Sequence, residues 1–500
     1  MSTPDEAIET TSAWEWKVPL GLLIFGLDVI AHWAFLVGQG TWFLLATAIA
    51  SIVLGPATRF VNLSSLQSLY AGRLAHTYLG AANEDRVHSG ESSETRDVDE
   101  SDPRDDVLLC EYHPEAAGGP LHLINVCVNE TVDVASGRQL SEDRGLPMCL
   151  GPQGVSVGLR FHALWDRLDP THLAVGERMV RQMENPVAPA DVERSALRAI
   201  RESANPDAFH VLASRKTSTV PVESLGLSRW MAISGAAIST GEGRLTNLPQ
   251  SLLLGLFNVR LGYWWDSHIR AKDRPGRYPP DLWRRLKSIP GALFRTQATF
   301  LNEWRGYFPG PSHKLWYLSD GGHWENTGLY ELIRRRLPFI IAVDAGHDPD
   351  YAFDDLALLT RRARLDFRAK LTWIDPTDAR GTGARDWAAI HQAAGGASVP
   401  AWIQSWLQPN ALGDLATLAR EGAFGAALAR ITYDGSASES WLVVLKPCLV
   451  SPPPMALDVC NYAKANGTFP NQSTVDQFFS EDQWESYRLL GEALTNAVIA

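Results

Sequence analysis

An aspartate followed by two glycines, Asp320-Gly321-Gly322, is the place in the sequence where residue types and spacing best fit a reactive site. Residues 315–318 before it are apolar and predict a short buried strand. The paired glycines break that pattern, because glycine adopts backbone angles that other residues avoid. Open α/β sheets place their functional groups at the carboxyl ends of strands. Asp320 is therefore the first candidate site residue, and the alternative is a polar turn that joins two core elements.

The segment after this turn predicts a helix and then another strand. Asn326 or Thr327 can cap the helix, whose leucines recur at helical spacing. Residues 338–345, PFIIAVDA, are apolar on both faces, as expected of an interior strand in a parallel sheet. Residues 314–345 thus predict a strand–turn–helix–strand unit.

Further elements extend this unit on both sides. Residues 121–129 predict the first core strand, residues 354–367 a second helix and residues 369–374 a strand after it. Strands that alternate with helices predict an α/β fold with a doubly wound, mainly parallel sheet. Residues 431–433 and 441–449 predict a hairpin that adds an antiparallel edge.

Three phrases resemble one protein family. Residues 319–336, SDGGHWENTGLYELIRRR, resemble the second catalytic block of the patatin-like phospholipases, the bacterial membrane-associated kind related to cytosolic phospholipase A2. Residues 232–237, AISGAA, resemble the A-x-S-A-A block of that family, and residues 461–491 resemble its closing segment. The resemblance runs from about residue 59 to the end and implies the C-terminal half of a patatin-like α/β domain over residues 107–500.

The resemblance assigns roles to particular residues. In the family the aspartate is the base of a Ser-Asp dyad, which implies that role for Asp320. Gly321 and Gly322 would then let the backbone approach the reacting atoms. The resemblance also implies that four consecutive residues line the site without supplying its nucleophile: Ser234, Gly235, Ala236 and Ala237.

The family's serine stands in a G-x-S-G-G-like elbow after a glycine-rich oxyanion loop, and the sequence shows no such elbow. Residues 154–158 fit the shorter pattern G-x-S-x-G, but no strand precedes Ser156 and no clear helix follows it. Ser234 follows a plausible strand, yet the family places a non-nucleophilic serine there. Three explanations remain: the nucleophile is on a partner subunit, it has been lost, or residues that precede this sequence carry it.

The N-terminal region predicts a membrane anchor. Residues 18–37 are largely apolar and long enough to cross a bilayer, and residues 41–55 form a shorter apolar run. We expect a transmembrane helical hairpin over residues 18–56, after a tail at residues 1–17. The alternative is a pair of buried core helices.

Flanking residues indicate how such a hairpin would be oriented. Trp14, Trp16 and Trp42 lie where interfacial aromatic residues belong. Arg59 and Arg73 follow the hairpin, which places the rest of the chain on the cytoplasmic side of an inner membrane.

Three further segments have distinct compositions. Residues 57–82 predict an amphipathic helix, with Leu63, Leu66, Leu69, Tyr70 and Leu74 on one side. Residues 83–106 are acidic and rich in serine, which predicts a disordered loop. Residues 251–265 predict a strongly apolar helix that packs in the core or rests on lipid.

Composition narrows the class of function. The net charge of −12 argues against a nucleic-acid partner, which requires a basic face. The five cysteines are odd in number and form no C-x-x-C pair, which indicates a reducing compartment without disulfides or a zinc site. We expect no metal and no cofactor.

The leading hypothesis is a component of a membrane lipid acyl hydrolase that supplies Asp320, with the nucleophile on a protein partner. A homo-oligomer is the other form of assembly that we expect. The rival hypothesis is a catalytically inactive, membrane-anchored scaffold or regulatory protein.

Overall fold

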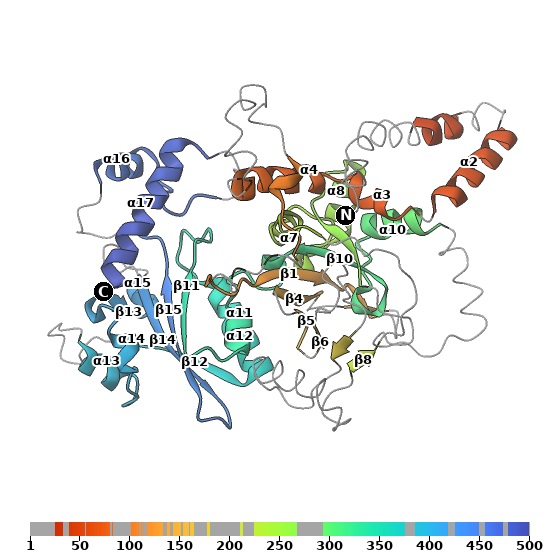
Figure 1. Cartoon of the computed structure of the whole chain (residues 1–500). Helices are drawn as coiled ribbons and strands as arrows, with labels where there is room; N and C mark the ends of the chain where they lie inside the picture. The colour runs from red at the N-terminus through yellow and green to blue at the C-terminus, as the bar shows by residue number, and fades with distance from the viewer. Residues whose placement is uncertain are drawn as a thin grey trace, which may run out of the picture. The chain divides into compact units, whose positions relative to one another are not determined.

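The computed structural model divides the chain into two compact units. Unit 1 comprises Met1–Gln182 and Pro206–Trp324, and unit 2 comprises Met183–Asn205 and Glu325–Ala500. The domain predicted over residues 107–500 is therefore shared between the two units (Figure 1). The structure describes these residues: 26–33, 40–55, 57–80, 83, 102–109, 112, 114, 118–133, 138–140, 144–151, 154–159, 161–164, 178–180, 211–213, 225–267, 294–375, 386–418, 426–449, 456–473 and 479–499.

Unit 1 is built on an eight-stranded sheet in which every neighbouring pair is antiparallel. Its strands, in spatial order, are β8 (Val211–Ala213), β7 (Arg178–Val180), β6 (Phe161–Leu164), β5 (Gly154–Val157), β4 (Gly145–Gly151), β1 (Ile124–Asn129), β10 (Leu315–Asp320) and β9 (Tyr263–Asp266). The strand predicted within residues 121–129 is confirmed as β1. A separate two-stranded ribbon pairs β2 (Val132–Asp133) with β3 (Arg138–Gln139).

Alternation along β10 builds a core on each face of this sheet, because successive strand residues point to opposite sides. Trp316 and Leu318 join one buried cluster, which contains Trp230 and Ile233 of α7 (Leu227–Ser234). Tyr317 joins another cluster on the opposite face. β10 is therefore apolar on both faces although all its pairs are antiparallel.

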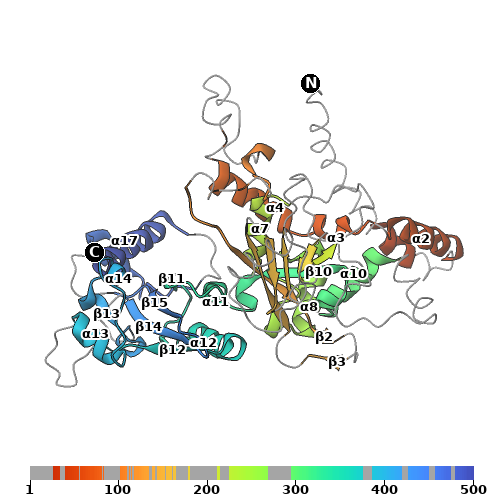
Figure 2. The same ribbon diagram turned by 60° about the horizontal axis from the view of Figure 1, so that its bottom comes forward.

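The helices of unit 1 cover the sheet in short pieces. α4 (Gln67–Leu74) packs against α7 (Figure 2), and α8 (Leu248–Leu256) packs against α10 (Arg295–Trp304). α3 (Arg59–Leu63) contacts α10 and β9. The remaining helical elements are α2 (Gly40–Leu54), the π-helix η3 (Ala75–Leu79) and the 3-10 turns η6 (Pro103–Asp105), η8 (Gly243–Leu245), η10 (Gly310–Ser312) and η11 (Gly321–His323).

Unit 2 has a five-stranded mixed sheet. Its main path is β11 (Phe339–Val343), β15 (Glu439–Leu445), β14 (Ala426–Tyr433) and β12 (Ala369–Trp373), and β13 (Leu412–Gly413) also pairs with β14. The helical elements are α11 (Leu329–Arg334), α12 (Asp354–Phe367), α13 (Trp387–Ala393), α14 (Ala401–Gln404), η12 (Pro409–Ala411), α15 (Leu415–Leu418), α16 (Leu457–Ala465) and α17 (Glu481–Val498). The predicted helix at residues 354–367 and the strand after it are confirmed. The predicted β14–β15 hairpin forms, but in the middle of the sheet and not at its edge.

The fold is mixed α/β with some parallel pairing, as predicted, but the expected mainly parallel sheet is wrong. Among the described strands, only β11–β15 and β13–β14 pair in parallel. β10 and β11 belong to different sheets, so they do not form one βαβ unit. For β10 the error has a physical reason: an apolar strand buried on both faces has the same composition whether its neighbours run parallel or antiparallel. Residues 338–345 were expected as an interior strand, but among the described strands β11 lies at the edge of its sheet and Val343 is 70% exposed.

The described part of the N-terminal region contains helical residues 26–33 and the 15-residue helix α2. None of the helices among the described residues combines the length and the apolar character needed to cross a bilayer. The hairpin predicted over residues 18–56 is thus unsupported, and the predicted tail at residues 1–17 lies outside the described residues.

The amphipathic helix predicted over residues 57–82 is broken into α3, α4 and η3, and its orientation is reversed. Leu63, Leu66 and Leu69 are exposed, whereas Gln67 is 0% exposed. Gln67 is held there by Arg229, whose Nη1 donates to Gln67 Oε1 at 2.6 Å. The hydrogen bonds of this amide offset the cost of its burial, and the leucines face solvent.

Two other predicted segments are corrected or partly described. The predicted helix over residues 251–265 ends as α8 at Leu256, because Asn258 has a left-handed φ of 56°, and the aromatic residues after it form β9. Of the predicted loop at residues 83–106, Asn83 and residues 102–106 are described. Asn83 Nδ2 donates to the buried Asp105 at 2.8 Å, and residues 84–101 lie outside the described part.

Candidate functional site

Asp320 is the last residue of β10 and lies opposite Val126 of β1. Its side chain is half-buried and caps η11, since Gly322 N donates to Asp320 Oδ1 at 2.7 Å. No donor among the described residues bonds its second oxygen, Oδ2. The carboxylate is thus fixed by one oxygen and has the other available as an acceptor.

The electrostatic environment makes Asp320 an unusually basic carboxylate. Burial raises the pKa of Asp320 to about 6, and the hydrogen bond from Gly322 N lowers it in part. Desolvation acts in this direction because it disfavours the charged form. A carboxylate with a pKa near 6 is ionised at neutral pH and still accepts a proton more readily than an ordinary aspartate.

Gly321 is required by close packing at the turn. A Cβ atom at Gly321 would lie 2.6 Å from the carbonyl oxygen of Asn125 on β1. Any other residue would push η11 away from the strand. The two glycines after Asp320 therefore have different tasks, because Gly322 contributes its N–H and Gly321 permits the approach of two backbones.

The structure brings residues 234–237 beside this turn, through contacts of Ser234 and Ala237. Ser234 Oγ donates to Asn125 O at 2.7 Å, which is the carbonyl that Gly321 approaches. Ala237 O lies 3.2 Å from His323 Nε2. Ser234 differs in one respect from its prediction, because it ends α7 and follows a helix instead of a strand.

A chain of hydrogen bonds links β1, β10 and η11 at the turn. Asn129 Nδ2 donates to Ser319 Oγ at 2.8 Å, and Ser319 Oγ lies 2.9 Å from His323 Nδ1. A carbonyl only accepts, so the bond to Ala237 O requires the proton on His323 Nε2, and Ser319 then donates to Nδ1. Burial lowers the pKa of His323 to about 4, which keeps the imidazole neutral near pH 7.

Tyr70 is a member of the site that the sequence did not indicate. The pKa of Tyr70 is raised first by burial and then by the charge of Asp320, so the phenol and the carboxylate interact electrostatically. Its hydroxyl occupies the space beside Gly235, where an added Cβ would lie 2.9 Å away. The sequence grouped Tyr70 with the leucines of an apolar face, and no local signal separates it from them.

Ser156 and Ser234, the two serines weighed as nucleophiles from the sequence, are not placed for that role. Ser156 lies inside β5, is buried and is paired with Cys149 and His162, so it does not occupy a strand-to-helix elbow. Ser234 donates its hydroxyl proton to a backbone carbonyl. Ser319 was not considered from the sequence, and it is fully buried on β10, although its hydroxyl lies 2.9 Å from His323 Nδ1.

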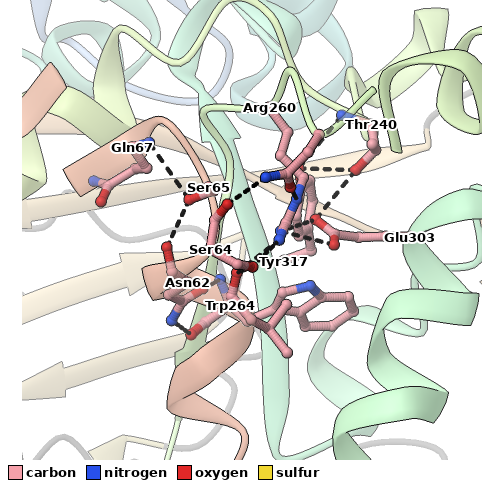
Figure 3. A network of polar contacts seen from close by, with 11 residues as sticks. Asn62, Ser64, Ser65, Gln67, Thr240, Arg260, Trp264, Glu303 and Tyr317 are labelled. Atoms are coloured by element: carbon pink, nitrogen blue, oxygen red, sulfur yellow. Dashed lines mark hydrogen bonds and ion pairs between the residues drawn. The ribbon is translucent and has the colours of Figure 1, made fainter. Parts of the chain in front are cut away.

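A second polar network lies on the other face of β10 (Figure 3). Arg260 and Glu303 form a buried ion pair, with Nη1 of Arg260 2.8 Å from Oε2 of Glu303. Tyr317 of β10 accepts a hydrogen bond from Thr240 Oγ1 at 2.9 Å, and burial raises the pKa of both Tyr317 and Glu303. This network joins β10 to α10.

Arg260 also reaches the N-terminal helices. Its Nη2 donates to Val61 O at 2.7 Å and to Ser64 Oγ at 2.8 Å. Asn62 exchanges two hydrogen bonds with the backbone of Trp264, each 2.8 Å long. These contacts tie α3 to the sheet, and Arg260 and Glu303 are buried and paired, so we assign the network a structural role.

No protein-family model, curated protein or solved structure matches this chain. Within the described residues, no group of three or more histidine, cysteine, aspartate or glutamate side chains is arranged to hold a metal ion. The site is therefore defined by its own geometry: a basic carboxylate, a glycine turn and residues 234–237 around Asn125.

Proposed function

We propose that this chain is a component of a patatin-like lipid acyl hydrolase and that Asp320 is its general base. The observation that carries the proposal is the pKa of Asp320, raised to about 6, together with an oxygen that no described residue occupies. Support also comes from the phrase around Asp320 and from the position of residues 234–237 beside it. The sheet topology adds no support, because its pairs are mostly antiparallel.

In this mechanism the nucleophile is a serine of a protein partner or of a second copy of the chain. Asp320 removes the proton from the serine hydroxyl as its oxygen attacks the ester carbonyl of a membrane lipid. Asp320 passes this proton to the alcohol, which leaves, and an acyl-serine ester remains. Asp320 then takes a proton from water, which attacks that ester and releases the fatty acid and the serine. The reaction would take place at the cytoplasmic face of the inner membrane.

The test begins with fluorophosphonate labelling of native membranes, capture of this chain and mapping of the labelled serine. A labelled serine on a co-purifying chain is expected. In that assembly Asp320→Asn should abolish ester hydrolysis and Asp350→Asn, an exposed aspartate of unit 2, should retain it. Full activity of Asp320→Asn would refute the role of Asp320.

The second candidate function is a catalytically inactive scaffold or regulatory protein. The positions of Ser156 and Ser234 favour it, because Ser156 lies inside a strand and Ser234 donates its hydroxyl proton to a backbone carbonyl. The scaffold predicts that no serine of this chain or of its partners reacts with fluorophosphonate, in membranes where other hydrolases are labelled.

A further inference from the structure

The outer side of α8 is apolar along its whole length. Leu248, Leu252 and Leu256 recur at intervals of four, so they share one face of the helix, and Leu253 lies beside them. All four are exposed, Leu256 by 59%, and Phe257 at the end of the helix is exposed by 72%. An isolated exposed leucine is ordinary, but a continuous stripe on one helix indicates an interaction site.

The inner side of α8 is fixed to unit 1. Ser251 Oγ donates to Thr240 O at 2.6 Å, and Gly255 lies against the Trp304 ring of α10, where a Cβ would be 2.2 Å from the ring. α8 therefore packs through its small residues and turns its leucines away from the core. The orientation follows from these contacts, and rotating the helix would break both of them.

Helices joined to α10 or to the end of α8 also carry exposed apolar residues. Leu301 on α10 is exposed, and so are Ile52 and Val53 on α2, whose end is joined to α10 by the hydrogen bond from Gln297 Nε2 to Ser51 O. On the other side, the side chain of Asn258 bonds to Ser64 O, between the exposed leucines of α3 and α4. We call α8 with the adjoining ends of α2, α3, α4 and α10 the apolar surface of unit 1.

The exposed charged side chains near this surface are basic and not acidic. The chain has a net charge of −12, yet the sequences of α2, α3, α4 and α8 contain no aspartate or glutamate. The one acid of α10, Glu303, is buried and paired with Arg260. Glu242, which precedes α8, is half-buried and accepts a hydrogen bond from Gln250.

Basic side chains lie next to the same surface. Arg244 precedes α8 and Arg305 follows α10, one helical turn after Leu301, and both are exposed. A stripe of leucine and phenylalanine that is bordered by arginine, with no exposed acid in these described helices, has the composition of a helix that lies in a membrane interface. The same arginines attract anionic headgroups.

We propose that unit 1 docks on an anionic lipid bilayer through this apolar surface, with α8 lying in the interface and its leucines in contact with acyl chains. The contact does not require a spanning helix and is independent of the catalytic role proposed for Asp320. Its occupant is lipid, and neither a second copy of the chain nor another protein.

Photocrosslinking of the purified full chain tests this contact directly. The chain is bound to vesicles of phosphatidylcholine with phosphatidylglycerol, the latter carrying a diazirine in its acyl chain, and the labelled peptides are mapped. Label is expected on the peptide that contains Leu252 and Leu256. No vesicle binding, or label confined to other parts of the chain, would overturn the proposal.

A matched pair of variants separates this surface from apolar residues in general. Leu252→Glu with Leu256→Glu should remove the label from α8 and weaken vesicle binding by about tenfold or more. Leu365→Glu with Leu457→Glu, at exposed leucines of unit 2, should change neither. Unchanged binding and labelling in the α8 variant would contradict docking by α8.

Two further variants complete the design. Arg244→Gln with Arg305→Gln should reduce binding only to vesicles that contain phosphatidylglycerol. An equal loss of binding to vesicles of phosphatidylcholine alone would contradict the attraction of these arginines to anionic headgroups. Asp320→Asn should keep the label on α8, so the docking and the catalytic proposals fail separately. Dimer crosslinks through α8 that lipid does not compete away would show that a second copy is the occupant.

Discussion

The imidazole Nδ1 of His323 lies 2.9 Å from the hydroxyl of Ser319, and the two residues bracket Asp320 on either side of the glycine turn. Ser319 is fully buried on β10 and also receives a hydrogen bond from Asn129 on β1. The position of the candidate base is therefore set by side chains from two strands, as well as by the backbone of the turn. The turn after Asp320 is a constrained structure.

The first prediction concerns this constraint. Ser319→Ala removes the hydroxyl that links Asn129 to His323 and leaves the buried Asn129 amide and the half-buried His323 ring without that partner, which should cost about 1–3 kcal/mol of unfolding free energy. Urea denaturation of the purified chain measures the loss. Ser405→Ala, at an exposed serine of unit 2, should lie within about 0.5 kcal/mol of the unchanged protein. Equal stability of the two variants would show that the link contributes nothing.

The second prediction uses the pKa of Asp320. Because the folded-state pKa is about 6 and the ordinary value is 3.8, the folded protein binds more protons between these two pH values. The stability contributed by this group is present below pH 3.8 and is lost as the pH rises through about 6. Asp320→Asn removes the ionisation and retains a side-chain oxygen for Gly322 N.

The variant should therefore gain stability relative to the unchanged protein as the pH rises from 4 to 7, by about 1–3 kcal/mol. His323 titrates in the same range but is present in both proteins, so its contribution cancels in the difference. Denaturation midpoints across this pH range provide the measurement. A difference that is constant with pH, or that changes in the opposite direction, would contradict the raised pKa.

The third prediction concerns the buried ion pair between Arg260 and Glu303. Glu303→Gln leaves the Arg260 charge buried without its carboxylate partner, which should cost about 3–5 kcal/mol of unfolding free energy. Glu485→Gln, which breaks the exposed pair with Arg488 on α17, is the matched control and should leave the denaturation midpoint unchanged. A similar, small effect of both variants would mean that the buried pair is dispensable.

The sequence was informative wherever the signal was local. The apolar run and paired glycines located the strand end at Asp320, and helical spacing located α12. The structure places the segment that contains Ser234 beside the turn, and its predicted part in lining a reactive site stays a prediction. Each of these predictions depends on a few consecutive residues and on backbone preferences that they carry themselves.

Other features depend on partners that are distant in the sequence. Whether β10 pairs with β11 or with β1 is decided by contacts across the whole unit, and its composition suits both. The apolar side of residues 57–82 was assigned to the core because leucine side chains are usually buried. In the structure Gln67 is buried and hydrogen-bonded to Arg229, and the leucines are exposed. Tyr70 was misassigned for the same reason.

The pairing of β1 with β10 also affects how the chain is made. Asn129 and Ser319 are 190 residues apart, so the hydrogen bond between them forms only after that length of chain has been synthesised. Until then β1 has β4 as a neighbour and an open edge on its other side. Contacts of such long range form slowly, and an open strand edge can pair with another chain. A nascent or prematurely terminated chain therefore exposes an aggregation-prone edge until the residues that carry Asp320 arrive to cover it.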